Sequence, residues 1–147
     1  KDLPVLEHDI ERLRSVEFVP FQAAISAGVP MIMTAHIVMQ GLGERVPATL
    51  SSRLMRGYLR QDLGFEGVIV SDDMEMAAIS DYYSVFKAVK LGLYAGVDAF
   101  LVCRRSELWY PLYDQLLEEA RRDEELAECI FEAAGRVVAL KRARLGG

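Results

Sequence analysis

The sequence predicts an α/β fold in which three parallel strands alternate with helices, and three observations favour it. Short runs rich in Val, Ile and Met, typical of strands buried on both faces, occur at residues 29–34, 67–71 and 98–103. Segments with the helical period separate these runs. The connections are short, and no linker or internal repeat divides the 147 residues, which indicates βαβ units within a single domain.

The first predicted helix starts at Asp9 and ends at Gly28. Asp is a favoured N-cap and Gly a favoured stop, and the apolar residues between them recur near one helical face. Pro20 is expected to kink this helix, because proline donates no backbone hydrogen bond. The strand at 29–34 follows, with Pro30 near its start, where a proline is tolerated.

A second helix is expected after a glycine-containing loop at 40–43 and the segment 47–52, with Gly64 as its stop. Its apolar positions are Leu54, Met55, Tyr58 and Leu59. The remaining elements are, in chain order, a strand at 67–71, a helix at 85–94 that stops at Gly96, a strand at 98–103, and helices at 108–121 and 125–145.

Composition excludes several classes of function. A net charge of -5 with interspersed acids and bases disfavours nucleic acid and an anionic membrane as partners. No apolar run has the length of a membrane span, and no cleavable leader opens the chain, although its first residue is not Met. Cys103 and Cys129 form no CxxC pair and are predicted to be reduced core residues, which suits a cytoplasm.

The segment 67–76 is the most informative stretch, because the apolar run Val-Ile-Val leads through Ser71 directly into Asp72 and Asp73. In parallel α/β sheets, ligands collect at the carboxyl ends of the strands. These two carboxylates are therefore candidates for an active site. The alternative is that one of them caps a helix that starts near Met74.

The other strands also end in polar residues, which a parallel sheet would bring to the same edge. Thr34 and His36 end the first strand, and Arg104 and Arg105 end the third. Together with the carboxylates they would suit a polar, hydroxyl-rich substrate. His36 can instead support neighbouring groups through hydrogen bonds. The two arginines can be surface charges or partners of Glu107.

Neither a metal nor a bound cofactor is indicated. His36, Asp72, Asp73 and Glu75 could in principle ligate a metal, but no HExxH helix or clustered His/Cys spacing occurs. The sequence also contains no glycine-rich phosphate loop and no G-x-S-x-G nucleophile turn. Met74 and Met76 are expected to be core residues rather than substrate contacts.

Residues 63–76, Leu-Gly-Phe-Glu-Gly-Val-Ile-Val-Ser-Asp-Asp-Met-Glu-Met, resemble the active-site signature of glycoside hydrolase family 3, in particular its bacterial β-N-acetylglucosaminidases. Other segments agree in order and spacing, so that the resemblance covers essentially the whole chain. These segments are Leu3-Pro-Val, Phe18-Val-Pro-Phe21, Ala27-Gly28, Met33-Thr-Ala-His36, Pro47-Ala-Thr-Leu-Ser51 and Val137-Val-Ala-Leu-Lys141.

The resemblance implies that residues 1–147 are a single partial domain, the last three βα units of a (β/α)8 TIM-type barrel. It assigns the catalytic nucleophile of a retaining glycosidase to Asp72, which would form a covalent glycosyl-enzyme without any cofactor. His36, Asp73 and Met74 would be substrate-binding or supporting residues. Asp73 is expected to face a helix or a neighbouring backbone amide, because successive side chains at a strand end diverge.

Part of the family pattern is missing from this chain. The resemblance implies an acid/base histidine within a Lys-His-Phe-Pro-Gly-His-Gly-Asp context, and this context is absent. His8 does not match it and is expected to be a surface or cap residue. Three strands also cannot close a barrel. The isolated chain is therefore expected to show little or no turnover, and to associate with the missing barrel half or another copy.

The activity that the resemblance favours is removal of terminal β-linked N-acetylglucosamine from cell-wall-derived glycans, as in peptidoglycan recycling. Two alternatives remain open within the family, a β-glucosidase and a glycoside phosphorylase. A third is a non-catalytic half-barrel that serves only in folding or assembly. The resemblance favours a bacterial cytoplasmic location, and export of the parent enzyme stays open.

Overall fold

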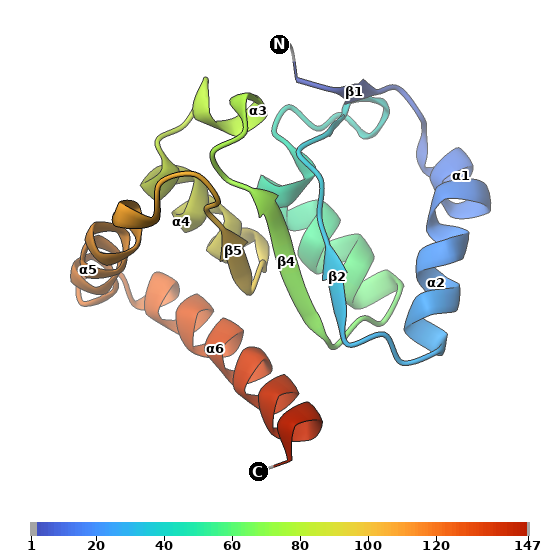
Figure 1. The fold of residues 1–147 in the computed structure, drawn as a ribbon. Helices are drawn as coiled ribbons and strands as arrows, with labels where there is room; N and C mark the ends of the chain where they lie inside the picture. Colours follow the sequence, from blue (N-terminus) through green and yellow to red (C-terminus); the bar gives the residue numbers. More distant parts are fainter. Residues whose placement is uncertain (1–2, 147) are drawn as a thin grey trace.

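A parallel three-stranded sheet lies at the centre of the computed structural model, which describes residues 3–146. Its strands are β2 (Met31–Met33), β4 (Val68–Asp73) and β5 (Ala99–Leu101), in the order β2-β4-β5 (Figure 1). Ile32 pairs with Ile69 in the register of the first pair. The structure thus confirms the predicted α/β fold with parallel strands, although β2 and β5 are each three residues shorter than expected.

The strands are wound in one direction only. In the sheet, β2 pairs with β4 and β4 pairs with β5. One helix connects the strands of each pair: η4 (Arg53–Asp62) lies between β2 and β4, and α4 (Val85–Ala95) lies between β4 and β5. Right-handed crossovers that advance in one direction place both helices on the same face of the sheet. The two helices indeed contact each other. Ile32 faces this helical layer, where it packs with Leu54 and Leu59.

The opposite face of the sheet is incompletely covered. Met31 and Met33, whose side chains alternate with Ile32, are 43% and 54% exposed. Within the part of the chain that the structure describes, β2 pairs with no strand on its outer edge. The three-stranded sheet thus has an open edge at β2 and exposes two methionines on this face.

The first helical segment matches its predicted ends. Asp9 caps α1 (Ile10–Arg12), where its carboxylate accepts a 2.8 Å bond from the Arg12 N–H. A wider helical turn at Leu13–Glu17 then leads into α2 (Phe18–Ser26), which contains Pro20. Such a widened turn accommodates a proline that cannot donate to the preceding turn. The helix ends before Gly28, whose φ is 78°.

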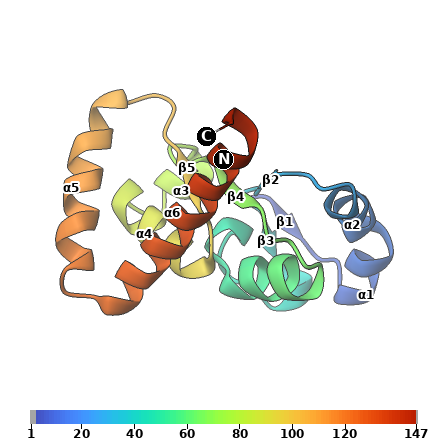
Figure 2. The ribbon, with the colours of Figure 1, turned by 90° about the horizontal axis from the view of Figure 1, so that it is seen from below.

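The later helices also follow local signals. Ser84 caps α4 by accepting a bond from the Lys87 N–H, and Gly96, with φ 102°, ends it. Asp123 caps α6 (Glu124–Leu145) in the same way through the Leu126 N–H. Figure 2 shows α1 and α2 at one end of the row of elements and α5 (Trp109–Ala120) at the other. Among residues 3–146, none of the helices combines the length and apolar character that a membrane crossing needs.

Several short elements have no counterpart in the sequence prediction, among them the 3-10 turns Gln40–Leu42, Ala48–Leu50 and Ser106–Leu108. The strand β1 (Val5–Leu6) pairs in parallel with β3 (Val38–Met39) and forms a separate two-stranded sheet. The short helix α3 (Ala77–Ser80) follows β4. Elements of two to four residues show no periodicity that a sequence pattern could reveal.

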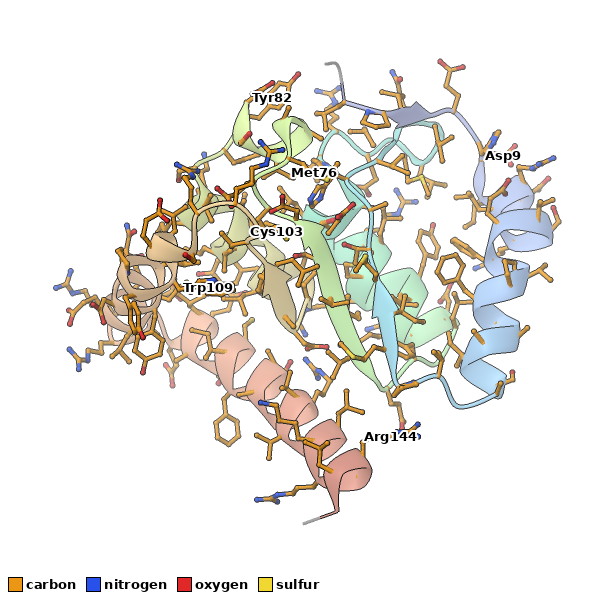
Figure 3. The ribbon with its side chains drawn as sticks, in the orientation of Figure 1. Asp9, Met76, Tyr82, Cys103, Trp109 and Arg144 are labelled. Carbon is orange, nitrogen blue, oxygen red and sulfur yellow. The ribbon has the colours of Figure 1, made fainter. Side chains whose placement is uncertain are left out.

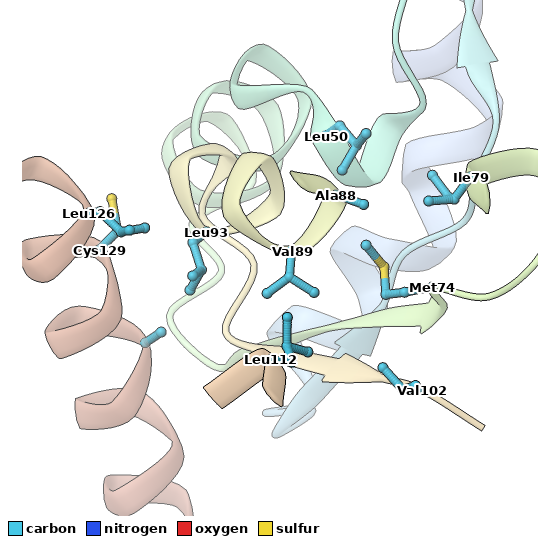
Figure 4. Close-up of a cluster of buried hydrophobic side chains, with 11 residues drawn as sticks. Leu50, Met74, Ile79, Ala88, Val89, Leu93, Val102, Leu112, Leu126 and Cys129 are labelled. Carbon is cyan, nitrogen blue, oxygen red and sulfur yellow. The ribbon is translucent and has the colours of Figure 1, made fainter. Parts of the chain in front are cut away.

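Helix α4 supplies the centre of one hydrophobic cluster. Its Ala88, Val89 and Leu93 pack against Leu126 of α6 and Leu112 of α5, all buried (Figure 4). Cys129 of α6 lies in the same cluster, as predicted for a reduced core cysteine. Burying one Val or Leu side chain contributes roughly 1.5–3 kcal/mol, so this cluster fixes α5 and α6 to the sheet.

A buried ion cluster closes the amino end of the sheet. The carboxylate of Asp98, directly before β5, is fully buried. It accepts bonds from Arg60 Nη2 at 2.6 Å, Arg136 Nε at 2.7 Å and the Ile69 N–H at 2.7 Å. One acid thereby joins η4, β4, β5 and α6 at the end of the strands opposite to Asp72.

Candidate active site

The central strand β4 delivers two carboxylates to the carboxyl edge of the sheet. Val68–Ser71 is buried, and the half-buried Asp72 and Asp73 follow directly. Asp72 Oδ1 accepts a 2.7 Å bond from the Asp73 N–H. The second carboxylate oxygen of Asp72 accepts no hydrogen bond from any residue that the structure describes. It is therefore available to act as a nucleophile or a base.

Asp72 lies in a β-bulge. Val70 pairs with Ala99 and Asp73 pairs with Leu101, so that β4 uses one residue more than β5 between the two pairs. The Ser71 hydroxyl accepts a 3.1 Å bond from the Leu101 N–H inside this irregular stretch. Bulges re-aim side chains and are frequent beside active sites.

Asp73 points to backbone amides, as expected. Its Oδ1 accepts bonds from the Glu75 N–H at 3.1 Å and the Cys103 N–H at 3.2 Å. The alternative that Asp72 or Asp73 caps a helix starting near Met74 is wrong, because α3 starts only at Ala77. The Met74 N–H, directly after β4, instead donates to the Leu101 carbonyl at the end of β5.

His36 supports the site through hydrogen bonds. It is 3% exposed, and its two ring nitrogens lie 3.0 Å from Thr49 Oγ1 and 3.1 Å from the Asp73 carbonyl oxygen. Because a carbonyl only accepts, we assign the ring proton to Nε2, and Nδ1 accepts from Thr49. Thr34 lies 2.7 Å from Thr49 and completes the chain of hydroxyls.

Burial lowers the pKa of His36, although the Asp73 carbonyl and the charges of Asp72 and Asp73 raise it. Through Nε2, the imidazole holds the peptide that follows Asp73. Thr49 was not singled out from the sequence. Only the structure shows that it lies within hydrogen-bond distance of both Thr34 and His36, which follow β2.

Two further expectations, that Cys103 and Met76 are core residues, are corrected by the structure. Cys103 is exposed, because β5 ends two residues earlier, at Leu101. Met76 is 37% exposed, whereas Met74 is fully buried in the α4 cluster, outside any helix. Figure 3 shows Met76 and Cys103 near the carboxyl edge of the sheet. Met74 is thus a core residue beneath the site, as predicted, and not a substrate contact.

Arg105 pairs with Glu75 and not with Glu107. Arg105 Nε lies 2.6 Å from Glu75 Oε1, and this carboxylate is 3% exposed. The side-chain hydrogen bond from Arg105 is the main cause that lowers the pKa of Glu75 to about 2. Sequence reasoning considered Glu75 only as a metal ligand; an acid enclosed between two methionines was the available signal of a buried, paired carboxylate.

His8 is a surface residue, as expected, with its side chain 42% exposed and 3.9 Å from Glu17. Among residues 3–146, no three His, Cys, Asp or Glu side chains gather in a way that could hold a metal ion. The chemistry carried by the described residues is thus that of an ionisable carboxylate, Asp72, on a bulge supported by His36 and Asp73.

Comparisons with known proteins point to one enzyme family. The chain is 42% identical to a β-hexosaminidase of Stenotrophomonas maltophilia and 38% identical to β-hexosaminidase A of Pseudoalteromonas piscicida. These matches cover 64% and 68% of this chain but only 28% and 19% of the relatives. The chain therefore spans less than a third of the length of the relatives it matches.

Solved structures agree with the sequence relatives. A family 3 β-N-acetylglucosaminidase from Paenibacillus sp. superimposes with a TM-score of 0.87 and 40% identity, over 98% of this chain and 28% of that one. A β-N-acetylhexosaminidase from Beutenbergia cavernae gives a TM-score of 0.85 with 28% identity, over 95% of this chain and 41% of that one. Residues 1–140 match the N-terminal domain of glycosyl hydrolase family 3, and the chain belongs to this family.

Proposed function

We propose that this chain supplies the nucleophile of a retaining glycosidase that removes terminal β-linked N-acetylglucosamine from cell-wall-derived glycans. The observation that carries the proposal is the position of Asp72, a carboxylate with an oxygen free of protein donors, on a bulge at the carboxyl edge of the sheet. The names of the relatives, β-hexosaminidase and β-N-acetylglucosaminidase, support this substrate class.

In the proposed reaction, Asp72 attacks the anomeric carbon while the bond from this carbon to the leaving oxygen breaks. A second group protonates the leaving oxygen. In the second step this group takes a proton from a water molecule whose oxygen attacks the anomeric carbon, so that the bond from this carbon to Asp72 breaks and the sugar leaves with its configuration retained. The family motif for this second group does not occur in the sequence. We therefore propose that the isolated chain has little or no turnover.

We further propose that residues 1–147 form a single partial domain, the last three βα units of a (β/α)8 barrel. The one-directional winding supports this, because a barrel needs strands that advance in one direction with all helices outside. The open edge of β2 and the exposed Met31 and Met33 are what an unclosed barrel would present. The missing half, or another copy, would cover them. A bacterial cytoplasmic setting fits the two free cysteines.

A chimera tests the assignment of Asp72. Residues 3–140 of this chain replace the matching segment of the Paenibacillus enzyme, with which the chain aligns over 98% of its length. We expect the folded chimera to release nitrophenolate from 4-nitrophenyl β-N-acetylglucosaminide. The Asp72→Ala variant should lose this activity. Added azide should restore it by forming the α-glycosyl azide, because a small anion can enter the space of the missing carboxylate.

The matched control is Asp114→Ala, which removes an exposed aspartate of α5. It should leave turnover unchanged. Equal activity of the Asp72→Ala chimera and its parent would refute the assignment of the nucleophile. If the circular dichroism spectrum shows that the chimera is folded but the chimera has no activity, the proposal that this chain carries a functional site is refuted.

A further inference from the structure

Besides Asp72 and Asp73, the carboxyl edge contains a third acid, Glu75, which is more deeply buried. The Glu75 carboxylate accepts three hydrogen bonds through its two oxygens. Its Oε2 accepts from the Arg104 N–H at 2.7 Å and the Arg105 N–H at 3.1 Å, and Oε1 accepts from Arg105 Nε at 2.6 Å. These bonds join the turn after β4 to the loop after β5.

 Within the turn itself, the Glu75 N–H donates to Asp73 Oδ1 at 3.1 Å.

Two neighbouring bonds extend this connection. The Met74 N–H donates to the Leu101 carbonyl at 2.8 Å, and the Cys103 N–H donates to Asp73 Oδ1 at 3.2 Å. We call residues 73–75 and 101–105, with the bonds between them, the rim clamp. All bonds of the rim clamp follow the bulge that contains Asp72, on the side of the carboxyl ends of the strands.

The bulge is thus held from both sides. On one side, the regular pairing of Val70 with Ala99 fixes it, and on the other side the rim clamp does. An extra residue in a strand leaves the local ladder incomplete, so its geometry depends on the pairs that flank it. Without the clamp, β4 could regain a regular register only by moving Asp72.

We infer that Glu75 is a positioning residue for the glycosidase reaction, which holds Asp72 at the sugar through the rim clamp. This inference rests on the proposed function of Asp72. Glu75 does not touch the substrate in this scheme. Its Oε1 pairs with the Arg105 guanidinium, and its Oε2 accepts hydrogen bonds from the backbone N–H groups of Arg104 and Arg105.

The test uses the chimera, because turnover requires the acid/base group that this chain does not contain. Glu75→Gln keeps the size of the side chain but removes its charge and one acceptor oxygen. We expect kcat for the aryl glycoside to fall about 10- to 100-fold, because a displacement near 1 Å can cost that much. KM should change less than about twofold, since no substrate contact is removed.

Two further variants separate positioning from loss of stability. Arg105→Lys keeps the positive charge and both backbone N–H donors, so its kcat should lie between those of the parent and Glu75→Gln. Asp98→Asn is the matched control, because Asp98 is also a buried acid with two arginines and a backbone donor, but at the opposite end of the sheet. It should destabilise the protein while kcat per folded molecule stays unchanged.

The outcomes are distinct. If Glu75→Gln keeps the parental kcat, or if Asp98→Asn lowers kcat per folded molecule equally, the positioning role is refuted. If Glu75→Gln does not fold, Arg105→Lys decides the question. A parental kcat of Arg105→Lys would overturn the inference, and a kcat below that of the parent would support it. Full activity of Asp72→Ala would instead refute the proposed function, whatever the Glu75 variants show.

Discussion

Replacing Asp98 by asparagine is expected to lower the free energy of unfolding by about 3–5 kcal/mol, the cost of breaking a buried ion pair from one side. The Asp98 carboxylate is fully buried, and Arg60 and Arg136 are 13% and 25% exposed. Asparagine keeps an oxygen for the Ile69 N–H but leaves Arg60 without a counter-charge and Arg136 with only the half-exposed Glu132, 3.5 Å away. For a domain of this size, the loss corresponds to a fall in Tm of roughly 6–20 °C.

The assay is urea unfolding of the 147-residue chain, followed by far-ultraviolet circular dichroism and by the fluorescence of Trp109, the single tryptophan. Asp62→Asn is the control, because Asp62 pairs with Arg14 at the surface, where both side chains are more than 40% exposed. Its effect should stay below about 1 kcal/mol. Equal effects of the two substitutions would refute the reasoning that burial makes the Asp98 cluster essential.

Two other predictions concern His36 and the glycines. Because burial lowers the pKa of folded His36, the unfolded chain binds the proton more readily, so stability should fall as the pH drops below about 6.5. His36→Gln should weaken this pH dependence of urea unfolding relative to His8→Gln, and an unchanged slope would contradict it. Gly96→Ala should cost about 1–3 kcal/mol, since φ is 102°. Gly57 lies within the helix η4, and a Cβ added there meets no atom within 4 Å, so Gly57→Ala should stabilise the protein by about 0.5–1 kcal/mol. Thermal unfolding that shows stabilisation by Gly96→Ala and destabilisation by Gly57→Ala would refute the argument.

Local signals explain most of the fold that the sequence predicted. The helix α4 appears nearly as expected because Ser84 and Gly96 mark its ends through contacts within a few residues. The strand β5 was placed too long, so that Cys103 was assigned to the core although it is exposed. Nothing in an apolar run marks the residue at which strand pairing stops, because pairing depends on the neighbouring strand.

The site was predictable only in part, for the same reason. The run into Asp72 predicted a carboxylate at the sheet edge, and the structure places it there. The pairing of Glu75 and the role of Thr49 were missed because their partners, Arg105 and His36, lie 30 and 13 positions away along the chain. A sequence pattern shows spacing within an element, whereas these contacts depend on how separate loops meet.

Three glycines with positive φ, Gly28, Gly64 and Gly96, each end a helix and lead into the next strand of the sheet. All three therefore lie at the amino end of the strands, remote from Asp72. They divide the chain into successive units of one strand and its following helix, joined by a backbone conformation that glycine adopts readily. Recombination between family members at these joints would exchange whole units while the loops around Asp72 stay intact, so that the surroundings of this carboxylate can be varied one unit at a time.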